Sequence, residues 1–106
     1  MSDHALVEGL AGLASRVDTL SHLTEGDDSR TLEEQEDRLA KLTLVAIALD
    51  MDATNAKYKD AVNRVQGAID AIGDGDRRIR NVAQVISKVA KALDVAEKLI
   101  TKLAGV

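Results

Sequence analysis

The strongest constraint in this sequence is a series of apolar residues near its C-terminal end that recurs at alternating steps of three and four. Such spacing places all of these side chains on one side of an α-helix. Because the series holds a 3.5-residue period over residues 79–103, it favours coiled-coil-like packing against other helices. It predicts a helix over about residues 76–104, with an apolar stripe made of Ile79, Val82, Ile86, Val89, Leu93, Ala96, Ile100 and Leu103.

The N-terminal segment carries the same kind of stripe. It predicts a helix over about residues 3–23, with Ser2 or Asp3 as the N-cap. Gly9 and Gly12 each weaken this helix by about 1 kcal/mol relative to alanine, so we expect it to need a partner surface. The two glycines also permit a close approach of another backbone. The stripe consists of Leu6, Leu10, Leu13, Val17 and Leu20.

The next helix is expected to begin near Leu32, because Thr31 and Glu34 have the spacing of a capping box. Two interpretations then compete for residues 32–72. In the first, one helix of roughly 60 Å runs through the whole segment. In the second, the segment breaks near Asp52, with Asp52 or Thr54 as a new N-cap. We take the continuous helix as the expected form, because residues 50–55 contain neither glycine nor proline.

A tight turn is predicted at residues 73–76, where Gly73 ends one helix and Asp74 or Asp76 caps the next. The resulting fold class is all-α: one domain over residues 1–106, built as an antiparallel bundle of three long helices, or four if the middle helix breaks. The composition also favours a helical bundle. The chain has no proline to stop a helix, and because Tyr58 is its only aromatic residue, the core must consist of aliphatic side chains that let helices pack closely.

Residues 42–49 are apolar almost all round the expected helix, so this segment should contact at least two neighbours. One neighbour can be the first helix. The other can be the last helix or a second chain. We therefore add Leu42, Val45 and Leu49 to the stripe of the last helix as candidate interaction residues.

Charge is distributed unevenly along the chain. Residues 1–76 carry sixteen Asp and Glu against seven Lys and Arg, whereas residues 77–106 carry two against seven. Three long helices cannot bury all of their apolar stripes within one chain, so we expect a homo-oligomer, most simply an antiparallel two-fold dimer. In it, the acidic half of one chain can face the basic last helix of the other.

The sequence contains no recognisable catalytic or cofactor-binding pattern. It has no cysteine, and its two histidines, His4 and His22, lie near opposite ends of one expected helix and cannot share a metal. Asp74-Gly75-Asp76 is better explained as a turn than as a calcium loop. We therefore expect neither an enzyme nor a cofactor.

Nucleic acid is an unfavoured partner. The chain has a cluster of basic residues that could contact phosphates, but its net charge is −4 and it lacks the aromatic side chains on which bases stack. The cluster consists of Arg77, Arg78, Arg80, Lys88 and Lys91.

The function expected from these features is a non-enzymatic structural or protein-interaction module that self-associates or binds a partner through its apolar stripes. The alternative is a membrane-surface or pore-forming helical hairpin, because the last helix is lysine-rich on its polar side. We expect a cytoplasmic protein, since no signal sequence or membrane span is recognisable, although a protein secreted without a signal sequence would have the same features.

Overall fold

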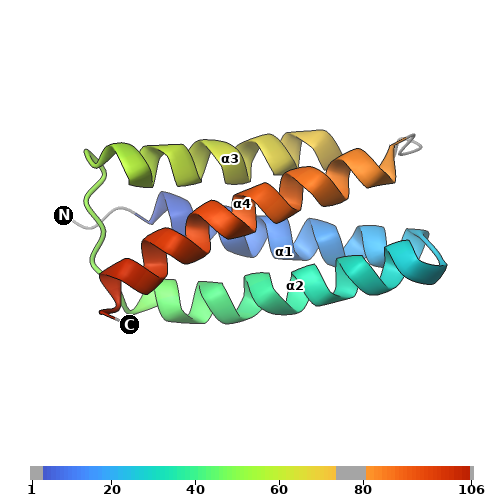
Figure 1. The fold of residues 1–106 in the computed structure, drawn as a ribbon, viewed down its shortest axis with the longest axis horizontal. Coiled ribbons are helices and arrows are strands. Elements are labelled where there is room, and N and C mark those ends of the chain that lie inside the picture. The colour runs from blue at the N-terminus through green and yellow to red at the C-terminus, as the bar shows by residue number, and fades with distance from the viewer. Residues whose placement is uncertain (1–3, 74–80, 106) are drawn as a thin grey trace.

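The computed structural model describes residues 4–73 and 81–105, and within these residues all regular structure is helical. Four helices lie lengthwise beside one another and pack compactly (Figure 1). The predicted all-α class is therefore confirmed. The helices are α1 (Ala5–Leu23), α2 (Gly26–Ile47), α3 (Ala56–Ile72) and α4 (Val82–Leu103).

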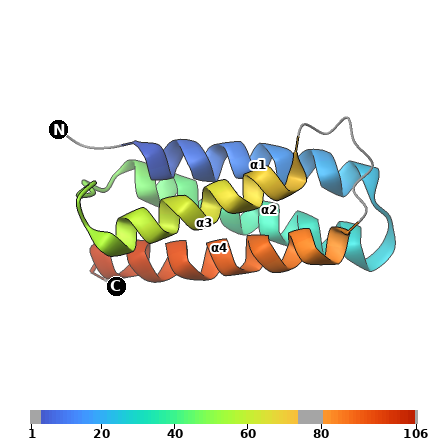
Figure 2. The ribbon, with the colours of Figure 1, turned by 90° about the horizontal axis from the view of Figure 1, so that it is seen from above.

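Each helix has two neighbours. α1 and α4 both contact α2 and α3, so that α1 and α4 face each other across the core, as do α2 and α3. The two views show that α1 and α3 run in one direction and α2 and α4 in the other (Figure 1, Figure 2). The α1/α2 and α3/α4 pairs are thus antiparallel hairpins, whereas the contacts between α1 and α3 and between α2 and α4 are parallel.

The continuous helix expected over residues 32–72 is not what the structure contains. α2 ends at Ile47 and α3 begins at Ala56, which places the interruption around Asp52, as in the second interpretation. The connection must also reach across the core, because α2 and α3 are not neighbours. At helix spacings of 8–10 Å the diagonal is roughly 14 Å, too far for a two-residue turn.

Side-chain hydrogen bonds replace the helical backbone bonds that are lost at this connection. Asn55 caps α3, its Oδ1 accepting from the backbone N–H groups of Lys57 at 2.8 Å and Tyr58 at 3.2 Å. Asp52 Oδ1 accepts from the N–H of Thr54 at 2.9 Å and from its hydroxyl at 2.7 Å. Met51 is buried in the core. Local capping and one buried side chain therefore stop the helix without glycine or proline.

The start of α2 also differs from the prediction. The helix begins at Gly26 rather than near Leu32, so Thr31 lies inside it and the predicted capping box does not form. Gly26 has φ +67°, which allows a turn of only Thr24 and Glu25 between α1 and α2. Carbonyl groups at the end of α1 are satisfied by hydroxyls: Thr24 donates to Leu20 O at 3.1 Å, and Ser29 of α2 donates to Ser21 O at 2.8 Å.

The turn between α3 and α4 is described in part. Gly73 ends α3 as predicted, with φ +72° and its N–H donating to Ile69 O at 3.1 Å. α4 begins at Val82, not near residue 76, and its cap is Asn81, whose side chain accepts from Gln84 N at 3.0 Å. The predicted capping residues Asp74 and Asp76 lie outside the described residues, as do Ser2 and Asp3.

The core lies between the four helices and is made almost entirely of aliphatic side chains. The predicted stripe of α1 is buried along its whole length, each of its five side chains being at most 2% exposed. Two polar contacts tie distant helices together. The Tyr58 hydroxyl of α3 accepts from Leu6 N at the start of α1 (3.1 Å), and Gln35 Nε2 of α2 donates to Ile86 O of α4 (3.0 Å).

Glycine plays different roles in α1 and α3, and this difference yields a testable prediction. A Cβ added at Gly9 would lie 3.0 Å from Val65 Cγ1, so a side chain, and not the expected backbone, approaches this glycine closely; one added at Gly67 would meet nothing within 4 Å. Gly67→Ala should therefore stabilise the protein by about 0.5–1 kcal/mol through helix propensity alone. Gly9→Leu should destabilise it by about 1–3 kcal/mol through overpacking. Urea unfolding of both variants measures this, and a destabilised Gly67→Ala variant would contradict the description of α3.

Candidate interaction surfaces

Most of the predicted stripe of α4 faces the core of its own chain. Val89, Leu93, Ala96 and Ile100 are at most 1% exposed, and Val82 and Ile86 are partly buried against the same core. Leu103, at the end of the helix, is 45% exposed. Ile79 lies outside the described residues. Because the connection at residues 48–55 folds the chain back, α2 and α3 contact α4, and its stripe faces the core of the same chain rather than a second chain.

The candidate residues of α2 are divided between the inside and the outside. Leu42 is buried, Leu49 is partly buried, and Val45 is 46% exposed. Two neighbours that the sequence analysis did not single out are more exposed: Leu44 at 71% and Ile47 at 62%. The signal that could have identified them is the run of apolar residues at 42–49, which is too wide for one buried stripe.

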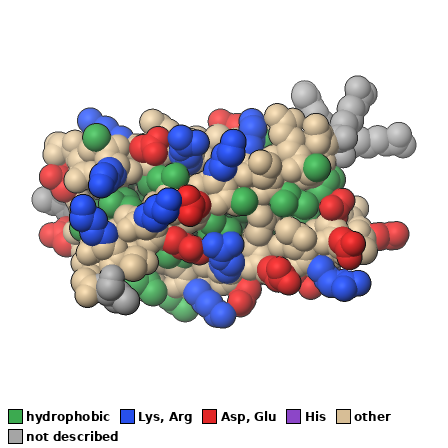
Figure 3. Space-filling view, in the orientation of Figure 1, with side chains coloured by type: hydrophobic (Ala, Val, Ile, Leu, Met, Phe, Trp, Pro, Cys, Tyr) green, Lys and Arg blue, Asp and Glu red, His purple; other side chains and the backbone are tan. Residues whose placement is uncertain are grey.

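These exposed residues gather at one end of the molecule. α2 and α4 are parallel neighbours, so their C-terminal ends lie together (Figure 1). In the space-filling view, hydrophobic side chains reach the surface at the lower left, where α2 ends (Figure 3). We call this surface the apolar patch; it consists of Leu44, Val45, Ile47 and Leu103. Leu23, another large exposed apolar residue, lies at the opposite end, where α1 ends.

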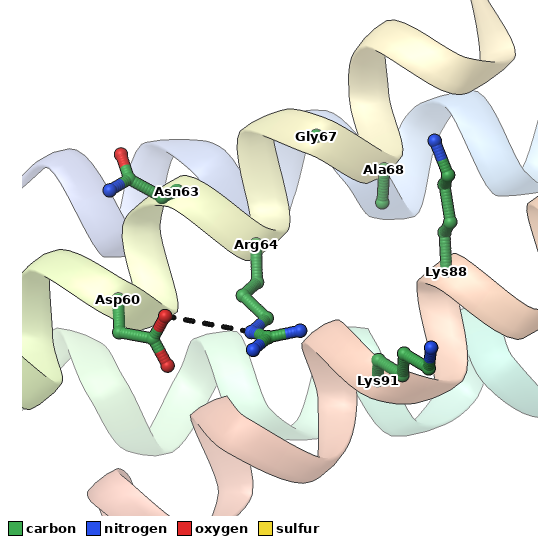
Figure 4. Close-up of a pocket in the computed structure, with 7 residues that line it drawn as sticks. All are labelled: Asp60, Asn63, Arg64, Gly67, Ala68, Lys88 and Lys91. Atoms are coloured by element: carbon green, nitrogen blue, oxygen red, sulfur yellow. Dashed lines mark ion pairs between the residues drawn. The ribbon is translucent and has the colours of Figure 1, made fainter.

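A groove of about 330 Å³ runs between α3 and α4 and carries mainly positive charge. Lys88 and Lys91 form no ion pair with any described residue, and Arg64 Nε lies 3.5 Å from Asp60 Oδ1. In the close-up, the Arg64 guanidinium extends toward α4 and Asn63 points away from the gap (Figure 4). We call this surface the cationic groove; it is lined by Asp60, Asn63, Arg64, Gly67, Ala68, Lys88 and Lys91.

Acidic side chains gather at the α1/α2 contact, around His22. Partial burial, and the nearby carboxylate of Asp18 to which it is hydrogen-bonded, raise the pKa of Glu36. The pKa of His22 is also raised, first by its hydrogen bond to Asp18 O (2.8 Å) and then by the negative charge of Asp18. Glu33 adds to the negative charge acting on both groups. The side of the bundle formed by α1 and α2 therefore carries negative charge around His22.

Two features were sought among residues 4–73 and 81–105: a cluster of metal-binding side chains and a membrane-spanning helix. No three His, Asp or Glu side chains within residues 4–73 and 81–105 are grouped so that they could hold a metal ion. No helix in the same part of the chain has the length and hydropathy needed to cross a membrane. Arg77, Arg78 and Arg80, the remainder of the predicted basic cluster, lie outside it.

Comparison of the chain with models of protein families, with curated proteins and with solved structures gave no match.

Proposed function

We propose that this protein is a non-enzymatic helical association module that forms a homodimer through the apolar patch. The observation that carries the proposal is the exposure of Leu44, Val45, Ile47 and Leu103 at one end of an otherwise well-buried aliphatic core. Exposed apolar side chains gathered at one end of a protein can form an association surface.

The size of the apolar patch indicates what kind of dimer to expect. A stable interface covers about 800 Å² on each partner. Four side chains form only the apolar centre of such an interface, and polar neighbours supply its rim. Self-association should therefore be reversible and depend on protein concentration.

Mutating the apolar patch should abolish self-association without unfolding the chain. The wild-type mass should rise from 11.3 kDa toward twice that value with increasing concentration. A Leu44→Glu/Ile47→Glu variant should remain at the chain mass, because both side chains are already largely exposed in the protomer. Sedimentation equilibrium measures this.

The matched control is Leu23→Glu, which places a charge on an equally exposed leucine at the other end of the molecule. It should associate like the wild type. A monomeric wild type at every concentration, or equal weakening by the control, would contradict the proposal.

A membrane surface is the second candidate partner for the same residues. The apolar stripe of α4 is buried in the four-helix core, so a lipid-bound hairpin would require that core to open. The apolar patch needs no opening, and it lies beside the exposed residues Lys41 and Lys102, as in proteins that bind anionic bilayers. Binding of the monomer to anionic vesicles that is lost in Leu44→Glu/Ile47→Glu would favour this function over dimerisation.

A further inference from the structure

We propose that the cationic groove between α3 and α4 binds a phosphate group that carries two negative charges, as in a phosphate monoester. Three cationic side chains from the two helices line it: Arg64 of α3, and Lys88 and Lys91 of α4. The phosphate belongs either to a small molecule in solution or to the headgroup of a lipid. This site goes beyond the proposed self-association and does not depend on it, because the apolar patch shares no residue with the groove.

The carboxylates of α3 compensate little of the positive charge in the groove. Asp60 is the one carboxylate among the lining residues, and its Oδ1 lies 3.5 Å from Arg64 Nε. Both partners of this pair are about half exposed, and exposed pairs contribute little to stability. Asp70, the other carboxylate of α3, accepts a hydrogen bond from Gln66 at 3.1 Å and does not line the groove. Arg64 therefore remains able to exchange a weak partner for a more highly charged one.

The carboxylates of α4 are engaged away from the groove. Asp94 forms an ion pair with Lys98 at 3.2 Å, one turn further along the same helix. Glu97 forms an ion pair with Arg38 of α2 at 2.7 Å, on the opposite side of α4 from α3. The two lysines of the groove thus have no ion pair with any described residue, and on the face shown in Figure 3 basic side chains gather over α3 and α4. Like charges held close together repel one another, so a bound anion would relieve this repulsion.

The number and the types of these cations suit a phosphate dianion. A guanidinium group offers parallel N–H donors to phosphate oxygens, and a lysine ammonium adds a compact positive charge. In the close-up, the Arg64 guanidinium extends toward α4 and Lys88 extends toward α3, so both reach into the space between the helices (Figure 4). A phosphate monoester carries about two negative charges at neutral pH, whereas a carboxylate or a phosphodiester carries one. The monoester therefore compensates more of the charge of three cations.

Gly67 leaves space for such a ligand on the α3 side of the groove. A glycine inside a helix costs about 1 kcal/mol relative to alanine. Neither a positive φ nor close packing requires glycine at this position, because an added Cβ would meet nothing within 4 Å. Gly67 and Ala68 lie between Arg64 and Lys88, so the smallest lining residues stand between the cations (Figure 4). The groove measures about 330 Å³, which is at the lower end of the range for small-molecule sites, about 300–1,000 Å³.

Removing the lysines of the groove should weaken phosphate binding. In a titration with inorganic phosphate at constant ionic strength, backbone amide NMR signals around the groove should shift. Lys88→Gln/Lys91→Gln should weaken binding roughly tenfold or more, because two charge-assisted contacts are lost. The matched control, Lys57→Gln/Lys59→Gln, removes the same charge from exposed side chains outside the groove and should bind phosphate like the wild type. Equal weakening by the control would overturn the site.

Filling the groove tests its space separately from its charge. Gly67→Leu should also weaken phosphate binding, because the new side chain occupies the gap between the cations. The variant should nevertheless be at least as stable as the wild type in urea unfolding, since leucine favours the helix and its Cβ meets no neighbour. A stable Gly67→Leu variant that binds phosphate as well as the wild type would mean that the anion lies elsewhere.

Vesicles distinguish the two sources of the phosphate group. Phosphatidic acid presents a phosphate monoester, whereas phosphatidylglycerol presents a phosphodiester. If phosphatidylcholine vesicles containing phosphatidic acid bind the wild type but not Lys88→Gln/Lys91→Gln, and those containing phosphatidylglycerol bind neither, the ligand is a lipid headgroup. If inorganic phosphate binds in the groove and neither vesicle does, the ligand is a small molecule.

Two further results would contradict the site. The first is that neither inorganic phosphate nor phosphatidic acid vesicles bind the wild type. The second is that both kinds of vesicle bind the wild type and Lys88→Gln/Lys91→Gln equally, which would mean that the groove does not recognise the phosphate. Neither result bears on the proposed function, which is tested separately by the mass of the Leu44→Glu/Ile47→Glu variant.

Discussion

Leu93→Asp should unfold the protein at room temperature. Leu93 is fully buried near the middle of α4, where all four helices contribute to one core. Truncating such a leucine costs about 2–5 kcal/mol, and an aspartate must in addition be either buried as a charge or protonated. Because a domain of this size is stable by about 5–15 kcal/mol, the combined loss is enough to remove the folded state or leave it marginal.

Far-UV circular dichroism and thermal melting measure this effect, with Ala90→Asp as the control. Ala90 lies in the same helix but is exposed, so its variant should retain helicity and a cooperative melt. A Leu93→Asp variant with wild-type helicity and an unchanged melting temperature would mean that the stripe of α4 does not face the core of the chain.

Tyr58→Ala should destabilise the protein by about 3–5 kcal/mol, the largest effect expected from a truncation outside α4. Tyr58 is the only aromatic residue of the chain and is 3% exposed, so its loss leaves a cavity between α1 and α3. Its hydroxyl also accepts the N–H of Leu6, which belongs to the first turn of α1 and has no helical partner.

The Phe variant separates these two contributions. Tyr58→Phe keeps the ring but leaves the buried N–H of Leu6 without this acceptor, which should cost about 1–3 kcal/mol. Urea unfolding followed by circular dichroism measures both variants without relying on tyrosine fluorescence. Equal stability of Tyr58→Phe and the wild type would show that the hydroxyl does not hold the start of α1.

The buried faces of the helices were the part of this fold that the sequence predicted best. The spacing of Leu6, Leu10 and Val17 identified the buried side of α1, and Gly73 identified the end of α3, because both signals are local. The break after α2 was only the less favoured of two interpretations, because the stop depends on interactions outside the helix itself. Asn55 becomes an N-cap, and Met51 becomes a core residue, only once the connection crosses the molecule.

The sequence could not show whether an apolar stripe packs within its own chain or against another chain. A stripe such as the one that contains Val89 and Leu93 has the same spacing whether it packs within its own chain or against another. Burial assigns it to the chain itself, which leaves Leu44 and Ile47 as the exposed part of the apolar run. The cationic groove could be predicted only in part, because Arg64 comes from α3 and its approach to α4 depends on the tertiary fold.

The claim on which the proposed function depends is that the chain folds back at residues 48–55. The chain has no cysteine, so a Glu33→Cys/Asp70→Cys variant can be spin-labelled at two exposed positions. A sample diluted with unlabelled protein then reports the distance within one chain by pulsed electron resonance. The four-helix structure places both labels toward the same end of the molecule (Figure 1), which predicts a distance of about 20–30 Å once label length is added to the helix spacing. A distance of about 55 Å, as along one continuous helix, would contradict it.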